Sequence, residues 1–290
     1  MEALTLPEVT TITSEVVLSL YPILIKVIDT GLDSQLLARL ATFTTLSAVF
    51  LYGFNVSKLL TNPLLVLFLG LLNLVHIGTS YQAFKDLPAG PAMALFYTFP
   101  FLNLLLAWFI LDEPISIGQL PWFLLAFVGS ILVVKSLKEK EGFESNQSTA
   151  RGIFAAFSAA LTESIIFVLT KNFHDSSPFP MMFQLYGGAL TLFIAGTISQ
   201  GKPILSDQKL STWIPLIIFN ACIGFIGYAL RFWSIPRLSV TIFSILSFIG
   251  VFSAYAFGAR FVGEVPSVES IAGGALIATS IAAVRSNFTF

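Results

Sequence analysis

The sequence predicts an all-α membrane protein with about ten transmembrane helices, arranged as two inverted five-helix repeats. The first observation is composition: 56% of the 290 residues are hydrophobic and only 11% are charged, whereas soluble domains keep roughly a quarter of their residues charged. The second is that about ten apolar stretches are long enough to cross a bilayer, which takes about 20 residues. The third is that one long polar stretch separates these stretches into two sets of five.

The predicted spans are 10–29, 35–53, 62–83, 88–111 and 117–135 in the first set, and 151–171, 180–199, 212–233, 236–260 and 267–285 in the second. Three prolines (Pro63, Pro121 and Pro215) lie near predicted helix starts, where the missing N–H does no harm. Pro22 and Pro100 lie well inside predicted spans, so we expect them to kink those helices.

The hydrophilic segment from Lys135 to Thr149 predicts a linker between the halves. We therefore predict a first repeat at 1–135, a polar linker at 136–150 and a second repeat at 151–290. Because each half has an odd number of spans, the two halves insert with opposite orientation. An ungapped shift of 151 residues superimposes the halves, and such repeats are typical of carriers whose site lies between them.

Charge and cysteine content exclude several classes of function. The net charge is −1 and no dense basic cluster is present, so the sequence does not favour nucleic-acid binding. The single cysteine, Cys222, lies in an apolar stretch, which favours a packing role and excludes an internal disulfide. We predict no metal and no cofactor. The predicted partners are a small-molecule substrate and membrane lipid, with the chain acting as a monomer or homodimer.

Two acidic residues lie inside predicted spans. An ionisable side chain near the bilayer centre costs roughly 2.5–3.5 kcal/mol on insertion scales, so each is a candidate for function. Glu163 lies about ten residues into the sixth span, and Glu15 lies in the first span of the other half. Either carboxylate could bind a proton in exchange for a cation or an amine. The alternative is a structural glutamate that reaches the interface or pairs with a lysine.

Polar stripes on the third and eighth spans predict a cavity lining. Residues that share one helix face by their spacing are Asn73, His76 and Ser80 in the third span, and Asn220, Gly224, Gly227, Tyr228 and Arg231 in the eighth. The shift of 151 residues places the first stripe on the second. Helix–helix hydrogen bonding is the competing explanation, and for His76 alone a packing role is favoured over a proton relay. Tyr97 is predicted either to contact substrate or to bridge helices.

A resemblance to a known family rests on the fourth span and the turn after it. Its residues are Leu87–Ala92, Phe99–Phe101, Leu111–Ser116 and Gly129, with Gly263, Glu264 and Gly273 as the second copy. These residues resemble the EamA domain of the drug/metabolite transporter superfamily, although Val251 stands where the second copy would carry proline. The resemblance implies a ten-helix carrier that exports or exchanges small organic solutes around a central cavity. Arg39 matches an arginine common in this superfamily, where it implies a role in orientation or folding.

The segment from Thr162 to Lys171 is also similar to the first helix of the small multidrug resistance transporters. In that family a membrane glutamate precedes a lysine by eight residues and binds protons or drug cations. Glu163 and Lys171 match this spacing, whereas Glu15 and Lys26 are eleven residues apart.

The leading hypothesis is a secondary transporter of a small polar organic metabolite, such as an amino acid or amine, that works by alternating access. Proton coupling would use Glu163 or Glu15. One alternative is an organic-anion exchanger that holds its substrate with Lys26, Lys171 and Arg231. Another is a non-transporting membrane scaffold. Catalysis is disfavoured, because the sequence has no His-Glu-x-x-His run and no paired membrane aspartates, and no nucleophilic serine is evident beside its histidines.

Overall fold

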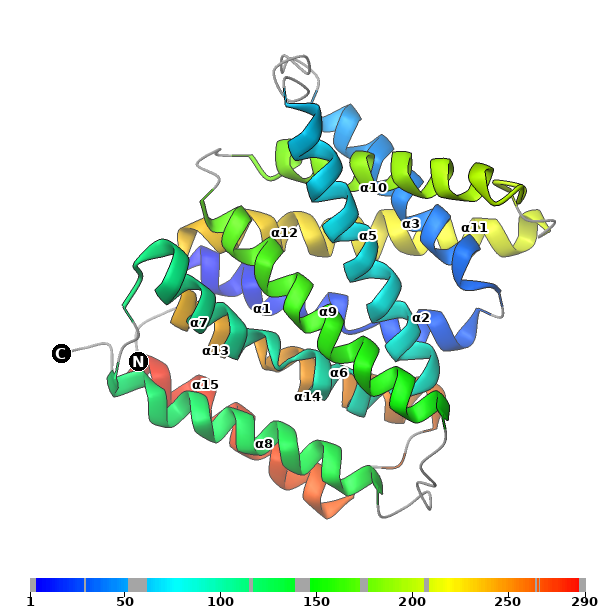
Figure 1. The fold of residues 1–290 in the computed structure, drawn as a ribbon. Coiled ribbons are helices and arrows are strands. Elements are labelled where there is room, and N and C mark those ends of the chain that lie inside the picture. The colour runs from blue at the N-terminus through cyan, green and yellow to red at the C-terminus, as the bar shows by residue number, and fades with distance from the viewer. Residues whose placement is uncertain are drawn as a thin grey trace.

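The structure is a computed structural model that describes residues 4–28, 30–51, 62–114, 117–138, 147–172, 177–205, 209–263, 265 and 267–286. All regular secondary structure in these ranges is helical (Figure 1). Seven helical segments in them are long and apolar enough to cross a membrane. Helices α3, α8 and α15, each of 19 residues, lie at the positions of the three other predicted spans. The prediction of an all-α membrane protein is confirmed. Ile115, Ser116, His174, Glu264 and linker residues 139–146 lie outside the described residues.

The first half contains five spans, two of which are broken. In chain order they are α1 (Leu6–Leu18) with α2 (Tyr21–Val27), α3 (Leu32–Phe50), α5 (Pro63–Asp86), α6 (Ala89–Phe96) with α7 (Phe99–Leu111), and η1 (Ile117–Gln119) with α8 (Leu120–Lys138). Pro22 and Pro100 lie in the first turns of α2 and α7. Each proline therefore begins a new helix rather than bending a continuous one, because its ring is compatible with a first turn and not with an interior.

The second half repeats this order. Its spans are α9 (Gln147–Lys171), α10 (Phe179–Ser199), α11 (Leu210–Phe219) continued by η2 (Asn220–Phe225), α12 (Ile226–Ser234) and η3 (Ile235–Arg237), then α13 (Val240–Ser247) with α14 (Ile249–Phe257) and η4 (Gly258–Val262), and α15 (Val268–Ser286). Pro215 lies inside α11 rather than near its start, so that prediction was wrong. Its helix begins earlier than expected, at Leu210, and η2 and η4 are π-helical.

The internal symmetry is visible in the broken spans. The shift of 151 residues places α6, from Ala89 to Phe96, on α13, from Val240 to Ser247. The turns that end these spans also coincide, because Asp112 and Gly263 are both left-handed, with φ of 52° and 77°. A left-handed residue at a helix C-terminus ends the helix and satisfies its last carbonyl groups. The second break forms without a proline. The break is therefore a feature of both repeats and does not depend on Pro100 alone.

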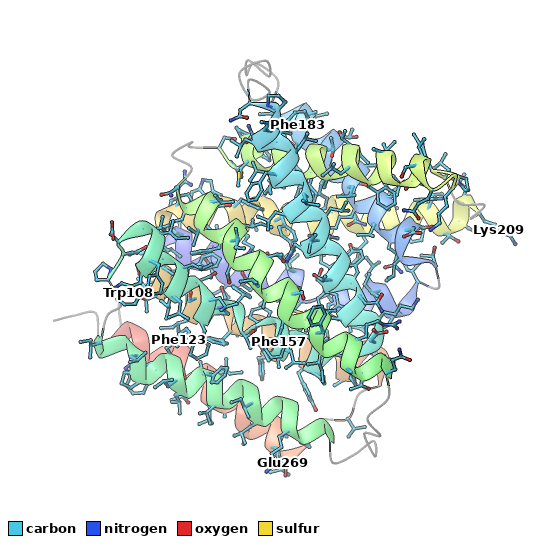
Figure 2. All side chains as sticks on the ribbon, viewed as in Figure 1. Trp108, Phe123, Phe157, Phe183, Lys209 and Glu269 are labelled. Atoms are coloured by element: carbon cyan, nitrogen blue, oxygen red, sulfur yellow. The ribbon has the colours of Figure 1, made fainter. Side chains whose placement is uncertain are left out.

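The spans form a central bundle with one helix pair at its edge (Figure 1). Helices α8 and α15 lie side by side at that edge, where a Cβ at Gly129 would overlap the backbone carbonyl of Gly273. Apolar side chains such as Trp108 and Phe157 point outward from the bundle, whereas Lys209 and Glu269 lie at helix ends (Figure 2). This distribution suits a protein with lipid around it, since the polar groups of the middle are turned inward.

Candidate functional site

Five central spans bring together a group of buried polar side chains, which we call the charge network: Glu15, His76, Tyr97, Glu163 and Arg231. Arg231 on α12 is the centre of this network. Its Nη1 lies 2.8 Å from Glu15 Oε1 on α1, and its Nη2 lies 2.6 Å from Glu163 Oε1 on α9. The three side chains are almost completely shielded from solvent. Arg231 therefore joins the first span of one half to the first span of the other.

Small residues on α9 allow its neighbours to approach Glu163. Ala156, Ala159 and Ala160 are all fully buried on this helix. Ser164, the residue after Glu163, donates a hydrogen bond of 3.0 Å to the carbonyl oxygen of Phe99 at the start of α7. This contact ties α9 to the first turn of α7, directly after the helix break.

The break between α6 and α7 positions Tyr97. Its hydroxyl donates a hydrogen bond of 2.5 Å to Glu15 Oε2. The hydroxyl lies against Gly250 in α14, where an added Cβ would overlap it. Glycine is required here because two helices and a phenol meet at one point. Glu15 thus has one oxygen on Arg231 and the other on Tyr97.

The surroundings of His76 assign a proton to the charge network. Its Nδ1 lies 3.2 Å from the carbonyl oxygen of Ala159, to which it can donate, and 3.4 Å from the Thr162 hydroxyl oxygen, from which it can accept, so the two contacts suit different tautomers. Nε2 lies 3.2 Å from Glu163 Oε2. A carboxylate oxygen and an unprotonated ring nitrogen repel each other, so this contact requires a proton between them. The His76–Glu163 pair therefore shares one proton.

A second buried cation lies beside the charge network. Arg39 on α3 is surrounded by a set of rings that we call the aromatic cage: Tyr21, Phe43, Tyr81, Tyr186 and Tyr228, at 4.6 to 5.8 Å from the guanidinium carbon. The Arg39 Nη2 donates a hydrogen bond of 3.0 Å to the Tyr186 hydroxyl, and its Nε is buried without a partner. Among the described residues, no carboxylate forms an ion pair with Arg39.

A small cavity of about 20 Å³ lies between the two arginines. Arg39, His76 and Arg231 contribute to its lining, together with rings of the aromatic cage and apolar side chains. A cavity needs roughly 10–15 Å³ to hold one water molecule, so this one has no room for an organic solute. The structure is a closed form, in which the spans must separate before a solute can enter.

The predicted site residues differ in where they lie relative to the cavity. Glu15, His76, Tyr97, Glu163 and Arg231 form the charge network, and Arg39 and Tyr228 lie beside it around the same cavity. Two further polar residues are buried nearby: Asn220 accepts a hydrogen bond of 2.9 Å from Tyr21, and Asn73 has an unpartnered amide nitrogen. The two lysines lie at the helix ends, away from the cavity lining.

The positions of Lys26 and Lys171 do not favour the predicted contact with substrate in the central cavity. Lys26 is half-buried in the last turn of α2, and Lys171 donates to the carbonyl oxygen of Leu238. Sequence reasoning missed Tyr21, Tyr81 and Tyr186, which form most of the aromatic cage. The described residues contain no group of three His, Cys, Asp or Glu side chains that could hold a metal.

Comparison with known proteins agrees with this architecture. A solved structure described as "Crystal structure of protein" has a TM-score of 0.71 and 19% identity to this chain, covering 97% of this chain and 95% of the other, which supports the fold alone. The uncharacterized transporter YxxF of Bacillus subtilis (strain 168) is 24% identical over 206 residues. That match covers 70% of this chain and 63% of the relative, so the chain spans less than two thirds of that protein's length.

The family model described as the EamA-like transporter family matches residues 6–135 and 150–286, one segment in each half of the chain. This match confirms the predicted resemblance and the multi-pass membrane location. The exact limits of the two repeats stay a prediction. The chain belongs to the EamA-like transporter family.

Proposed function

We propose that the protein is a secondary transporter that moves a small polar organic solute by alternating access, with the His76–Glu163 pair carrying a coupled proton. The observation that supports this most directly is the buried link from Glu15 through Arg231 to Glu163. It connects the first spans of the two repeats at the place where a carrier of this architecture has its site. Family membership supports transport in general, and the charge network supports the proton.

The shared proton gives the charge network two states. With the proton, His76 on α5 and Glu163 on α9 attract each other and hold the two spans together. Without it, and with the ring hydrogen on Nδ1 donated to Ala159, an Nε2 lone pair faces a carboxylate oxygen and the contact becomes repulsive. Loss of the proton therefore weakens the α5–α9 contact, which is a local charge change that biases a two-state element.

Broken helices supply the freedom that such a change requires. The breaks at Tyr97 and Phe248 lie at equivalent positions of the two repeats. The π-helical turn η2 ends at Phe225, six residues before Arg231, and π-bulges are frequent at functional sites. A carrier with discontinuous spans at its midplane can open to either side by moving one bundle against the other.

Reconstituted transport tests this proposal. The purified protein is placed in liposomes with an imposed pH gradient, and uptake is measured for a panel of labelled amino acids, amines and organic acids. We expect gradient-driven uptake of at least one solute, and its loss in Glu163→Gln, which cannot exchange a proton with His76. Asp33→Asn is the matched control, because it removes an exposed carboxylate at the start of α3.

Two outcomes would contradict the proposal. Uptake that is unaffected by Glu163→Gln would mean that the His76–Glu163 pair carries no coupled proton. Absence of uptake for the whole panel, in a protein that stays folded in the liposomes, would favour a membrane scaffold over a transporter.

A further inference from the structure

The charge on Arg39 has no anionic partner in the part of the chain that the structure describes. Its side chain is only 1% exposed, and its neighbours are neutral phenols and a phenyl ring. Burial of an uncompensated charge is costly in a medium of low dielectric, and phenol contacts recover only part of the cost. Arg231 differs, because two carboxylates lie within 2.8 Å of its nitrogens.

The charges around the cavity do not cancel in the proton-loaded form. We define this form as the one in which His76 Nδ1 carries a hydrogen and a further proton lies between His76 Nε2 and Glu163, so that the pair is neutral. Arg39 and Arg231 each contribute +1 and Glu15 contributes −1. The net charge is therefore +1. A bound monoanion would bring it to zero, and so would loss of the proton from the empty site. The site is neutral when both the proton and the anion are bound, and also when neither is bound. With only one of them bound, a net charge remains buried.

On this basis we propose that Arg39 binds the carboxylate group of a small monoanionic organic acid, which is bound and carried together with the proton of the His76–Glu163 pair. This inference rests on the proposed transport function and names its substrate class. A planar guanidinium matches the geometry of a carboxylate, to which it can donate two hydrogen bonds. Its unpartnered Nε supplies one of these donors.

The cavity walls favour an organic acid over an inorganic anion. Leu18, Phe84, Met93 and Phe96 contribute apolar side chains to the cavity lining, and they would contact the hydrocarbon part of the substrate. Binding sites for small organic molecules combine an apolar wall with a few polar groups in this way. Phosphate or chloride would leave these walls without a partner.

The two carboxylates of the charge network already have partners within the protein, which disfavours an amine as the substrate. Glu15 contacts Arg231 and Tyr97, and Glu163 contacts Arg231 and His76. A substrate cation would have to displace one of these groups and would add to a site that already carries +1. An anion would instead meet Arg39, which has no carboxylate partner among the described residues.

Calorimetric binding to the purified full-length protein in detergent tests the inference without a transport assay. The probes are propionate, L-lactate and benzoate, with their amides and the amines propylamine and benzylamine as matched controls. We expect at least one acid to bind at least tenfold more tightly than its amide and its amine. Titrations in two buffers with different ionisation enthalpies should show uptake of about one proton per bound acid.

Variants assign the binding to Arg39. Arg39→Gln should abolish acid binding, whereas Arg39→Lys, which keeps the charge but loses the planar fork, should weaken it by about tenfold or more. The matched control is Arg237→Gln, which removes an exposed guanidinium and should change affinity by less than twofold. If Arg39→Gln does not fold, the comparison of acid, amide and amine on the wild-type protein still decides the question.

Several results would overturn the inference. These are equal affinity for acids and amides, binding without proton uptake, tighter binding of chloride or phosphate, and acid binding unchanged in Arg39→Gln. Gradient-driven uptake of an amine together with no acid binding would refute this inference and leave the proposed transport function intact. Acid binding at Arg39 with no uptake of any solute would refute the proposed transport function and leave the binding of an acid at Arg39 intact.

Discussion

Arg231 and Arg39 are both buried guanidinium groups on the same small cavity, but their surroundings differ in kind. Arg231 forms ion pairs with carboxylates from the two halves of the chain, at 2.8 and 2.6 Å. Arg39 lies among aromatic rings and phenol oxygens, with the Tyr186 hydroxyl at 3.0 Å, and among the described residues no carboxylate forms an ion pair with it. The charge of the first arginine is balanced by carboxylates within the protein, whereas the second has no carboxylate partner among the described residues. The comparison separates a residue that holds the repeats together from one that could hold a substrate.

The same contrast extends to the tyrosines. Tyr97 donates its hydroxyl hydrogen to the charge network, and Tyr21 donates its own to Asn220 beside the aromatic cage. Each hydroxyl lies against a glycine of a neighbouring span, Gly250 and Gly224 respectively. Close backbone approach thus positions one phenol in each cluster, and the two clusters can be perturbed by similar substitutions.

The largest expected effect on stability comes from Arg231→Met. It leaves Glu15 and Glu163 buried without their cation, and removal of one partner from a buried ion pair typically costs about 3–5 kcal/mol. We expect a loss of this size in the free energy of unfolding, measured in detergent. Combining it with Glu15→Gln and Glu163→Gln should recover at least half of the loss, since the unpaired charges are then removed.

The control for this prediction is Arg237→Met, at an exposed position on η3, which should change stability by less than about 0.5 kcal/mol. Equal stability of Arg231→Met and the wild-type protein would show that the ion pairs contribute nothing. Arg231 would then differ from Arg39 in its contacts but not in its contribution to the stability of the protein.

Much of the fold could be predicted from the sequence, because a bilayer imposes a length and a composition on every span. The positions of Glu15, Glu163 and Arg231 were also evident, since a charged residue in an apolar span needs a partner. Their mutual contacts were not, because the rotation of each helix about its axis is set by packing between distant spans. The place of Tyr81 in the aromatic cage could not be predicted for the same reason, because a tyrosine in a span is as compatible with lipid contact as with packing around an arginine.

An intermediate effect is expected from the two glycines. Gly250→Ala would place a methyl group on the Tyr97 hydroxyl, and overpacking of this kind typically costs about 1–3 kcal/mol. Gly224→Ala should cost a similar amount against Tyr21. In transport assays, Gly250→Ala should reduce proton-coupled uptake because Tyr97 moves away from Glu15.

Second-site changes check the cause of these losses. Tyr97→Phe combined with Gly250→Ala removes the overlapping oxygen and should restore part of the stability, and Tyr21→Phe should do the same for Gly224→Ala. If both alanine variants are as stable as the wild-type protein, neither glycine is required by the close approach that the structure shows.

The smallest expected effect on stability comes from Arg39→Met. Loss of the guanidinium–ring contacts removes about 2 kcal/mol of attraction, but it also removes a buried charge without an anionic partner, which is costly to the folded state. The two terms oppose each other, so we expect the free energy of unfolding to change by less than about 1 kcal/mol. Destabilisation as large as that of Arg231→Met would mean that Arg39 is compensated within the folded protein. A stable Arg39→Met protein that no longer binds organic acids would instead separate folding from recognition at this position.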